Sequence, residues 1–146
     1  MTFIHEEDKS LILNASRIYV SYSGGSDSTY ALVKIKKYLD SAQLTSKFTA
    51  LHFNHGNKQS NAFESHCRDF CNERNITFES QNIKVEVSGE GFEAAARHKR
   101  MNVLKSLPEN SLIIQGHHSD DQIETVLFRI IRGTGLKGIS GIPRLT

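Results

Sequence analysis

Residues 17–28 read RIYVSYSGGSDS, and this stretch decides the fold. Its first six residues are rich in β-branched and aromatic side chains, which is typical of a buried strand. Two glycines follow, and residues 28–39 then place apolar side chains at helical spacing. A strand that turns through glycines directly into a helix is the opening of a βαβ unit. The stretch therefore predicts a parallel sheet that is flanked by helices.

The same alternation of short apolar runs and helical periodicity continues along the chain. Further strands are predicted at 47–53, 82–87 and 111–115, and further helices at 61–73, 91–107 and 119–131. The last helix is expected to begin at Ser119, because Gln122 completes a capping box with it. We predict one α/β domain over residues 1–146, with a Rossmann-like parallel sheet of four strands and a fifth strand missing. Ligands of such sheets bind beyond the carboxyl ends of the strands.

Length and composition are those of one ordinary globular domain. The chain has 146 residues, with 18 basic and 16 acidic side chains and a net charge of +2. This charge is too small to argue for nucleic-acid binding by itself. No apolar run approaches the roughly 20 residues of a membrane span. Cys67 and Cys71 stand four apart in a predicted helix, which suits neither a disulfide nor a closed zinc site. We therefore expect a cytoplasmic protein with reduced cysteines.

The glycine turn between the first strand and the first helix predicts an anion site. Bare backbone N–H groups, serine hydroxyls and the positive end of a helix all favour a phosphate guest. Asp27 would suit this site if Mg²⁺ accompanies the phosphates. It is not a Walker A loop, because the Gly-Lys-Ser/Thr ending is absent. The alternative is a turn with an ordinary helix cap. The predicted phosphate-binding residues are Ser23, Gly24, Gly25, Ser26, Asp27 and Ser28.

The segment Gly116-His-His-Ser-Asp-Asp-Gln122 occupies the equivalent turn after the fourth predicted strand. Two imidazoles and two carboxylates at one strand end could form the second half of a nucleotide and metal site. The alternatives are acidic residues that favour the helix dipole beside surface histidines, or a zinc site. The spacing, however, does not match His-Glu-x-x-His, and no cysteine lies nearby in sequence.

Two more motifs carry weaker signals. Glu93 and Arg97 have i, i+4 spacing, which is commonly a solvated ion pair, although Arg97 or Arg100 could also grip a phosphate as a planar fork. Residues 133–138 match Gly-x-Gly-x-x-Gly but follow a predicted helix instead of a strand. This position excludes a dinucleotide fingerprint and favours a loop near the ligand.

Taken together, these motifs resemble a known family. Ser23–Ser28 resembles the Ser-Gly-Gly-x-Asp-Ser loop of the N-type ATP pyrophosphatases, the PP-loop superfamily, and the full set is similar to the tRNA(Ile)-lysidine synthases. The set comprises Leu51–Gly56, Glu93–Arg100, His117–Thr125 and Arg132–Gly135. Met101 and Asn57-Lys58 depart from the family pattern at motif edges. The resemblance runs from about Arg17 to Ile142, which is only the front part of such an enzyme, so the tRNA-binding C-terminal parts are expected to be absent.

The resemblance implies a ligase. Such an enzyme uses ATP and Mg²⁺ to attach free L-lysine to the wobble cytidine of tRNA(Ile) with a CAU anticodon, through an adenylated cytidine. Asp27, Asp121 and Arg97 are implied as catalytic residues, and Asp27 and Asp121 as ligands of the metal. The residues implied in ATP binding are Ser23–Ser28 together with His118, Arg100, Gly133 and Gly135.

Two other functions compete with this one. The first is a thiolating PP-loop enzyme, which needs reactive cysteines, whereas Cys67 and Cys71 are expected mid-helix and far from every strand end. The second is a non-catalytic ATP-binding remnant, which suits the weak charge. If the fifth strand is missing, residues 111–115 would form an exposed sheet edge that favours association, for instance as a homodimer.

Overall fold

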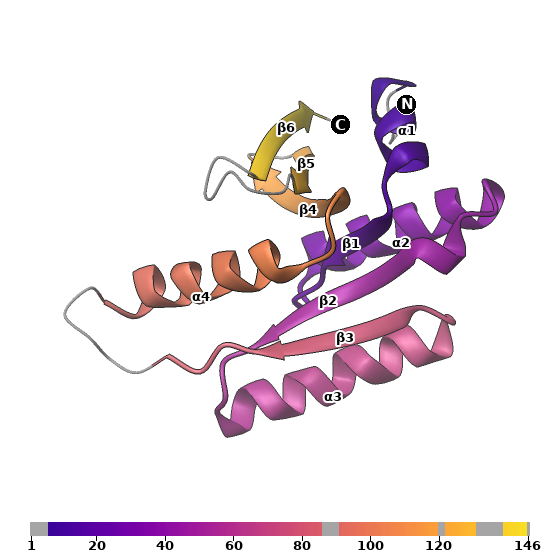
Figure 1. Cartoon of the computed structure of the whole chain (residues 1–146). Coiled ribbons are helices and arrows are strands. Elements are labelled where there is room, and N and C mark those ends of the chain that lie inside the picture. Colours follow the sequence, from indigo (N-terminus) through magenta and orange to yellow (C-terminus); the bar gives the residue numbers. More distant parts are fainter. Residues whose placement is uncertain (1–5, 86–90, 120–121, 131–138, 146) are drawn as a thin grey trace.

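The computed structural model describes residues 6–85, 91–119, 122–130 and 139–145, with side chains up to Gly116. Helices and strands alternate along most of the chain (Figure 1). The elements are α1 (Glu6–Asn14), β1 (Arg17–Ser21), α2 (Ser26–Ser41), the 3-10 turn η1 (Thr45–Lys47), β2 (Phe48–Asn54), α3 (Lys58–Glu73), β3 (Thr77–Asn82), α4 (Phe92–Ser106), β4 (Ser111–Ser119), β5 (Gln122–Ile130) and β6 (Ile139–Leu145).

The strands form one sheet in the order β3-β2-β1-β4-β5-β6. The four strands β1 to β4 are parallel, as predicted, with Val20 of β1 aligned with Ala50 of β2 and Ile114 of β4. β2 and β3 lie on one side of β1 in the sheet, whereas β4 lies on the other side. The order therefore reverses at β1, and a ligand of a parallel sheet is expected at that reversal.

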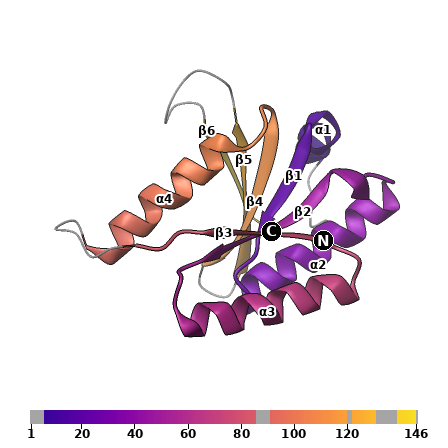
Figure 2. The same cartoon turned by 60° about the horizontal axis from the view of Figure 1, so that its bottom comes forward.

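Helices cover both faces of the parallel strands (Figures 1 and 2). α2 and α3 lie on one face, where Leu32, Ile35 and Cys71 pack with Ile18 and Ile114 of the strands. α4 lies on the other face, where its Leu104 packs with side chains from three strands, namely Tyr19, Leu51 and Ile113. These apolar residues are almost completely buried, which anchors the helices that flank the strand ends.

The predicted helix over residues 119–131 is wrong. Residues 122–130 form β5, antiparallel to β4, with Ser119 aligned with Gln122 and Ile114 with Leu127. The run Gln-Ile-Glu-Thr-Val-Leu-Phe-Arg-Ile fits helical spacing, but it is also rich in the β-branched and aromatic residues that favour strands. A short apolar run does not distinguish the two, and here pairing with β4 decides for the strand.

Two further expectations need correction. The sheet has more strands than the four predicted, because β5 pairs with β4 and β6 (139–145) pairs with β5. The segment 111–115 is consequently interior and not an exposed edge.

The third strand spans Thr77–Asn82 instead of residues 82–87. Asn75, with φ of 55°, ends the turn after α3, so the strand begins at once and the buried Ile76 and half-buried Phe78 belong to the core.

The parallel arrangement brings several segments to one edge of the sheet. The loop after β1, the turn after β2 and the last residues of β4 all lie at the edge of the sheet where the parallel strands have their carboxyl ends. In the part of the chain that the structure describes, none of the helices has the length and apolar character needed to cross a membrane.

Candidate functional site

The loop between β1 and α2 has the geometry of an anion cradle. Gly24 has φ of +88°, a conformation that L side chains rarely adopt, so the chain can turn sharply here. Gly25 is the N-cap of α2 and offers no side-chain cap. The N–H groups in the first turn of a helix have no acceptor within that helix, and in α2 these groups begin at Ser26. They stand at the positive end of a 16-residue helix, where an anion is stabilised.

Two serine hydroxyls hold this loop in shape. The buried Ser28 hydroxyl accepts from the Ser23 N–H at 3.1 Å and donates to the Gly25 carbonyl at 3.2 Å. The Ser23 hydroxyl lies 3.0 Å from the Ser28 hydroxyl and accepts from the Gly25 N–H at 3.3 Å. Ser28 thus acts within the loop, whereas Ser23 and Ser26 are exposed to a ligand.

Gly24 also lies directly against α3. A Cβ atom at this position would lie 2.9 Å from the Cys67 sulfur and 3.1 Å from the Phe63 ring. Any side chain here would push the loop away from α3. The expectation that Cys67 stands far from every strand end is therefore wrong, because α3 carries it beneath the loop after β1. Helical spacing alone does not reveal which residues of another element a side chain contacts.

The end of β4 meets the start of α2 from the other side. A Cβ atom at Gly116 would lie 2.8 Å from the Asp27 backbone oxygen and 3.1 Å from the Ala31 Cβ atom. Glycine is therefore required where β4 passes the first turn of α2. This contact brings Gly116 beside the Ser23–Ser28 loop. The prediction that residues 116–119 form the turn after the strand is wrong, because these residues continue β4 and pair with β5.

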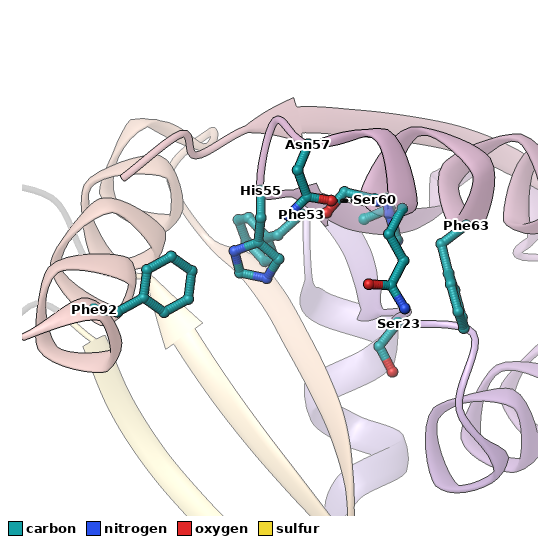
Figure 3. A pocket seen from close by; sticks show the side chains of 9 residues that line it. Ser23, Phe53, His55, Asn57, Ser60, Phe63 and Phe92 are labelled. Atoms are coloured by element: carbon teal, nitrogen blue, oxygen red, sulfur yellow. Dashed lines mark hydrogen bonds between the residues drawn. The ribbon is translucent and has the colours of Figure 1, made fainter. Parts of the chain in front are cut away.

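A pocket of about 380 Å³ adjoins the loop at Ser23. This volume falls in the usual range of small-molecule sites. Figure 3 shows Phe92 of α4 at one side and Phe63 of α3 at the other, with His55 and Ser23 between them. Phe63 and Phe92 are 48% and 49% exposed, which is unusual for phenylalanine, so each offers an aromatic surface to a flat guest.

Two histidines at the end of β2 add polar atoms to this pocket. The buried His52 donates its Nδ1 hydrogen to the Tyr22 carbonyl at 2.8 Å, because a carbonyl can only accept. Its Nε2 atom is then an acceptor in the neutral ring. His55 packs on the Phe92 ring at 5.8 Å between ring centres, and its buried Nδ1 atom has no hydrogen-bond partner in the described structure.

A polar network beneath the pocket fixes the turn after β2. The buried Asn54 accepts from the Gly56 N–H at 2.7 Å and donates to Asn61 at 3.0 Å and to Glu64. The hydrogen bond from Asn54 lowers the pKa of Glu64, and Ser80 and Arg68, the latter at 2.9 Å, add to this effect. Gly56 turns with φ of +82°, and Asn57 then caps α3 by accepting from the Ser60 N–H at 2.8 Å.

Of the other predicted site residues, Arg97, Arg100 and His118 have described positions, all of them outside the Ser23–Ser28 loop. Arg97 and Arg100 are exposed on α4, and within the described residues Arg97 makes no ion pair with Glu93. His118 belongs to β4, although its side chain lies outside the described structure. Asp121, Gly133 and Gly135 also lie outside the described residues.

No role was predicted for several residues of the site, although His52, His55 and Gly116 stand in two of the motifs quoted above. His52, His55, Phe63, Phe92 and Gly116 contribute to the pocket or to the contact beside the loop. The available signal was the unusual end of β2, where histidine, asparagine and glycine follow an apolar strand. The aromatic residues gave no signal, because Phe63 at helical spacing is equally compatible with a core position.

The donor chemistry beside the loop fits Mg²⁺. Asp27 places a half-buried carboxylate in the first turn of α2, next to the N–H groups that would hold phosphate oxygens. Mg²⁺ is usually bound by one or two carboxylates together with phosphates and waters. Among the residues that the structure describes, histidine, cysteine and acidic side chains form no cluster of three that could hold a metal ion by themselves.

The cysteines are poor nucleophiles in this environment. Cys67 and Cys71 are fully buried, and burial raises the pKa of Cys67 and raises that of Cys71 to about 11. Since the thiolate is the reactive form, both side chains stay protonated and inert near neutral pH.

Comparison with known proteins agrees with this geometry. A family described as the PP-loop domain matches residues 2–146. The tRNA(Ile)-lysidine synthase of Francisella tularensis is 38% identical over 145 residues, which cover 92% of this chain and 35% of that protein. The enzymes of the same name from Pseudomonas syringae and Coxiella burnetii are 39% and 37% identical over 131 residues. Each alignment covers 88% of this chain and 29% of the relative.

The chain thus spans about a third of the length of these relatives, and the matched third contains the loop and the pocket. A family match over nearly the whole chain, an α/β fold with four parallel strands and a glycine turn at the end of β1 all agree. The chain therefore belongs to the PP-loop family of ATP-binding domains and is related to the tRNA(Ile)-lysidine synthases.

Proposed function

We propose that this chain is the ATP-binding, base-activating part of a tRNA(Ile)-lysidine synthase. The observation that carries the proposal is that α2 begins without a side-chain cap next to an aromatic pocket. Ser23 belongs both to the loop before α2 and to the lining of the pocket. A triphosphate and a flat base are the two parts of ATP that such neighbouring sites suit. The relatives' names supply the tRNA, tRNA(Ile), and the product, lysidine. Free L-lysine is the co-substrate in this proposal.

In this proposal the β- and γ-phosphates of ATP lie on the Ser23–Ser28 loop. The N–H groups of Ser26 and Asp27 and the exposed hydroxyls of Ser23 and Ser26 donate to the phosphate oxygens. The adenine base occupies the pocket between Phe63 and Phe92. The ribose and the α-phosphate then lie between the loop and the pocket, which adjoin at Ser23.

The reaction activates a cytosine carbonyl. The oxygen at ring position 2 of the wobble cytidine attacks the α-phosphorus, the bond to the bridging oxygen breaks, and pyrophosphate leaves. The ε-amine of lysine then attacks ring carbon 2, so AMP departs and one proton is released. Negative charge grows on the leaving pyrophosphate, and N–H donors already fixed around it stabilise that charge without reorganising.

Asp27 is the residue that would hold Mg²⁺, with Asp121 as the second proposed ligand. When bound, the metal neutralises phosphate charge and orients the leaving group. Arg97 and Arg100 are the proposed cations for the α-phosphate and the adenylate, because a guanidinium grips two oxygens at once. His118, Gly133 and Gly135 complete the proposed ATP contacts. The chemistry takes place in the cytoplasm, where tRNA is modified.

The buried cysteines favour ligation over thiolation. A thiolating PP-loop enzyme needs an accessible thiolate, but Cys67 and Cys71 are buried and their pKa values are raised. Cys67 serves instead as packing beneath Gly24. The non-catalytic remnant retains the same loop and pocket, so product analysis has to separate it from the ligase.

Product identity tests this function. With α-labelled ATP, L-lysine and a tRNA(Ile) transcript bearing CAU, we expect label in AMP and release of pyrophosphate. Both should depend on the tRNA, and Asp27→Ala should abolish them while the variant keeps its circular dichroism spectrum. Formation of ADP and inorganic phosphate would contradict the proposal. Mg·ATP binding without any AMP would identify the remnant instead.

A further inference from the structure

α4 is the most basic of the described helices. Four of its 15 residues are lysine or arginine and one is acidic, so the helix alone carries +3 in a chain of net charge +2. α1 and α3 each hold more acidic than basic residues. The positive charge of the chain is thus concentrated on one element.

The basic side chains of α4 have no charge partners in the described structure. Arg97, Lys99, Arg100 and Lys105 are all exposed, and no described carboxylate forms an ion pair with them. Elsewhere such pairs do form, as between Lys36 and Asp40 at 2.5 Å. Like charges on one helix repel each other, so a cluster without carboxylates destabilises the free chain and favours an anionic partner.

Lys84 extends this surface toward the end of β3. The Lys99 ammonium donates to the Lys84 carbonyl, which holds the exposed Lys84 beside α4. We call the exposed lysines Lys84, Lys99 and Lys105 the basic α4 surface. α4, which carries most of this surface, lies on the opposite side of the sheet from α2 and α3 (Figure 2).

The basic α4 surface begins at the pocket. Phe92, the first residue of α4, lines the pocket and packs on His55. Lys105 lies 13 residues further along, which is about 20 Å at the rise of an α-helix. A polyanion that lies along α4 therefore has one end beside the candidate site. A nucleic acid is the polyanion that also carries a base to be modified beside the bound nucleotide.

We propose that the basic α4 surface binds the phosphate backbone of the RNA whose base is modified in the adjacent site. This inference rests on the proposed function and names the element that holds its macromolecular substrate. Lysines in this surface bind phosphates as point charges, so these contacts do not distinguish one RNA sequence from another. Since each neutralised phosphate releases a counterion, binding must weaken with salt.

The test compares two matched double variants. Lys99→Gln with Lys105→Gln removes two charges from α4, and Lys34→Gln with Lys37→Gln removes two exposed charges from α2 on the other face. The probe is an RNA hairpin with the CAU anticodon loop, and its affinity for the chain is measured by fluorescence anisotropy over a series of salt concentrations. Mg·ATP affinity is measured in parallel by calorimetry.

We expect the α4 variant to bind the hairpin several-fold more weakly at low salt. Its plot of log affinity against log salt should be less steep by about 1.4 to 1.8, because each phosphate contact contributes about 0.7 to 0.9. The α2 variant should keep the slope of the unmodified chain, and all three proteins should bind Mg·ATP equally.

Three results would overturn the inference: an unchanged slope in the α4 variant, an equal loss in the α2 variant, or no hairpin binding by the unmodified chain. Absence of Mg·ATP binding in the unmodified chain would instead count against the proposed function, so the two failures are distinguishable.

Discussion

At the scale of single residues, the site depends on positions where no side chain fits. Gly24 needs both a positive φ and the absence of a Cβ atom, because Cys67 and Phe63 lie beneath it. Gly116 is restricted by the Asp27 backbone and the Ala31 Cβ atom, and its φ is not positive. The two glycines let α3 and β4 approach the loop from both sides, which holds its N–H groups in a fixed arrangement.

Gly24→Ala should therefore cost stability in two ways. Positive φ costs about 1 kcal/mol for an L residue, and the contact with Cys67 adds a comparable amount. Replacing Cys67 by alanine as well removes this contact but leaves the positive φ and the contact with Phe63. A double-mutant cycle in urea should show a favourable coupling of about 1 kcal/mol between the two changes. Purely additive losses would contradict the contact.

Glu64 gives the fold a dependence on pH. Its hydrogen bonds to Asn54 and its pairing with Arg68 lower its pKa below the ordinary value of 4.5. A lowered pKa in the folded state means that the stabilisation is present above about pH 4.5 and is lost as pH falls through the folded value.

Glu64→Gln removes this dependence but keeps an acceptor for Asn54. At pH 7 the variant should be less stable than the unmodified chain by about 0.5 to 1 kcal/mol, since the side chain is partly exposed. The difference should shrink below pH 4.5 in urea titrations. A difference that stays constant down to pH 3 would be inconsistent with the lowered pKa.

At the scale of elements, patterns in the sequence predicted the four parallel strands and the three helices between them, but they missed α1 and β6 and assigned β5 to a helix. The first helix was predicted at 28–39 and spans Ser26–Ser41, because its apolar stripe is long and flanked by a glycine turn. The run after Ser119 has an apolar pattern that two kinds of element satisfy. Whether this run forms a helix or a strand depends on its pairing with β4. The local spacing of apolar residues does not reveal such pairing.

The strand β5 can be checked directly. Carbon chemical shifts of residues 122–130 should show the extended pattern of a strand, and their amides should exchange slowly because β5 lies between β4 and β6. Helical shifts over the same residues would mean that the sequence pattern was right and that the antiparallel pairing is not the state in solution.

At the scale of the whole molecule, the site is a product of topology. The Ser23–Ser28 loop was predictable from the residues themselves, because glycine and serine between a strand and a helix have few other uses. The pocket was not, since His55, Phe63 and Phe92 come from three segments that only the fold brings together. In the same way, the approach of Cys67 to Gly24 depends on how α3 packs on the sheet.

The central claim is that the loop and the pocket together form one site for ATP. Nuclear magnetic resonance titration of the isotope-labelled chain tests it most directly, with Mg·ATP, pyrophosphate and adenosine added separately. We predict that pyrophosphate shifts the amides of residues 23–28, that adenosine shifts those of the turn at residues 55–57, and that Mg·ATP shifts both sets. Shifts confined to other segments, or none with Mg·ATP, would contradict the claim.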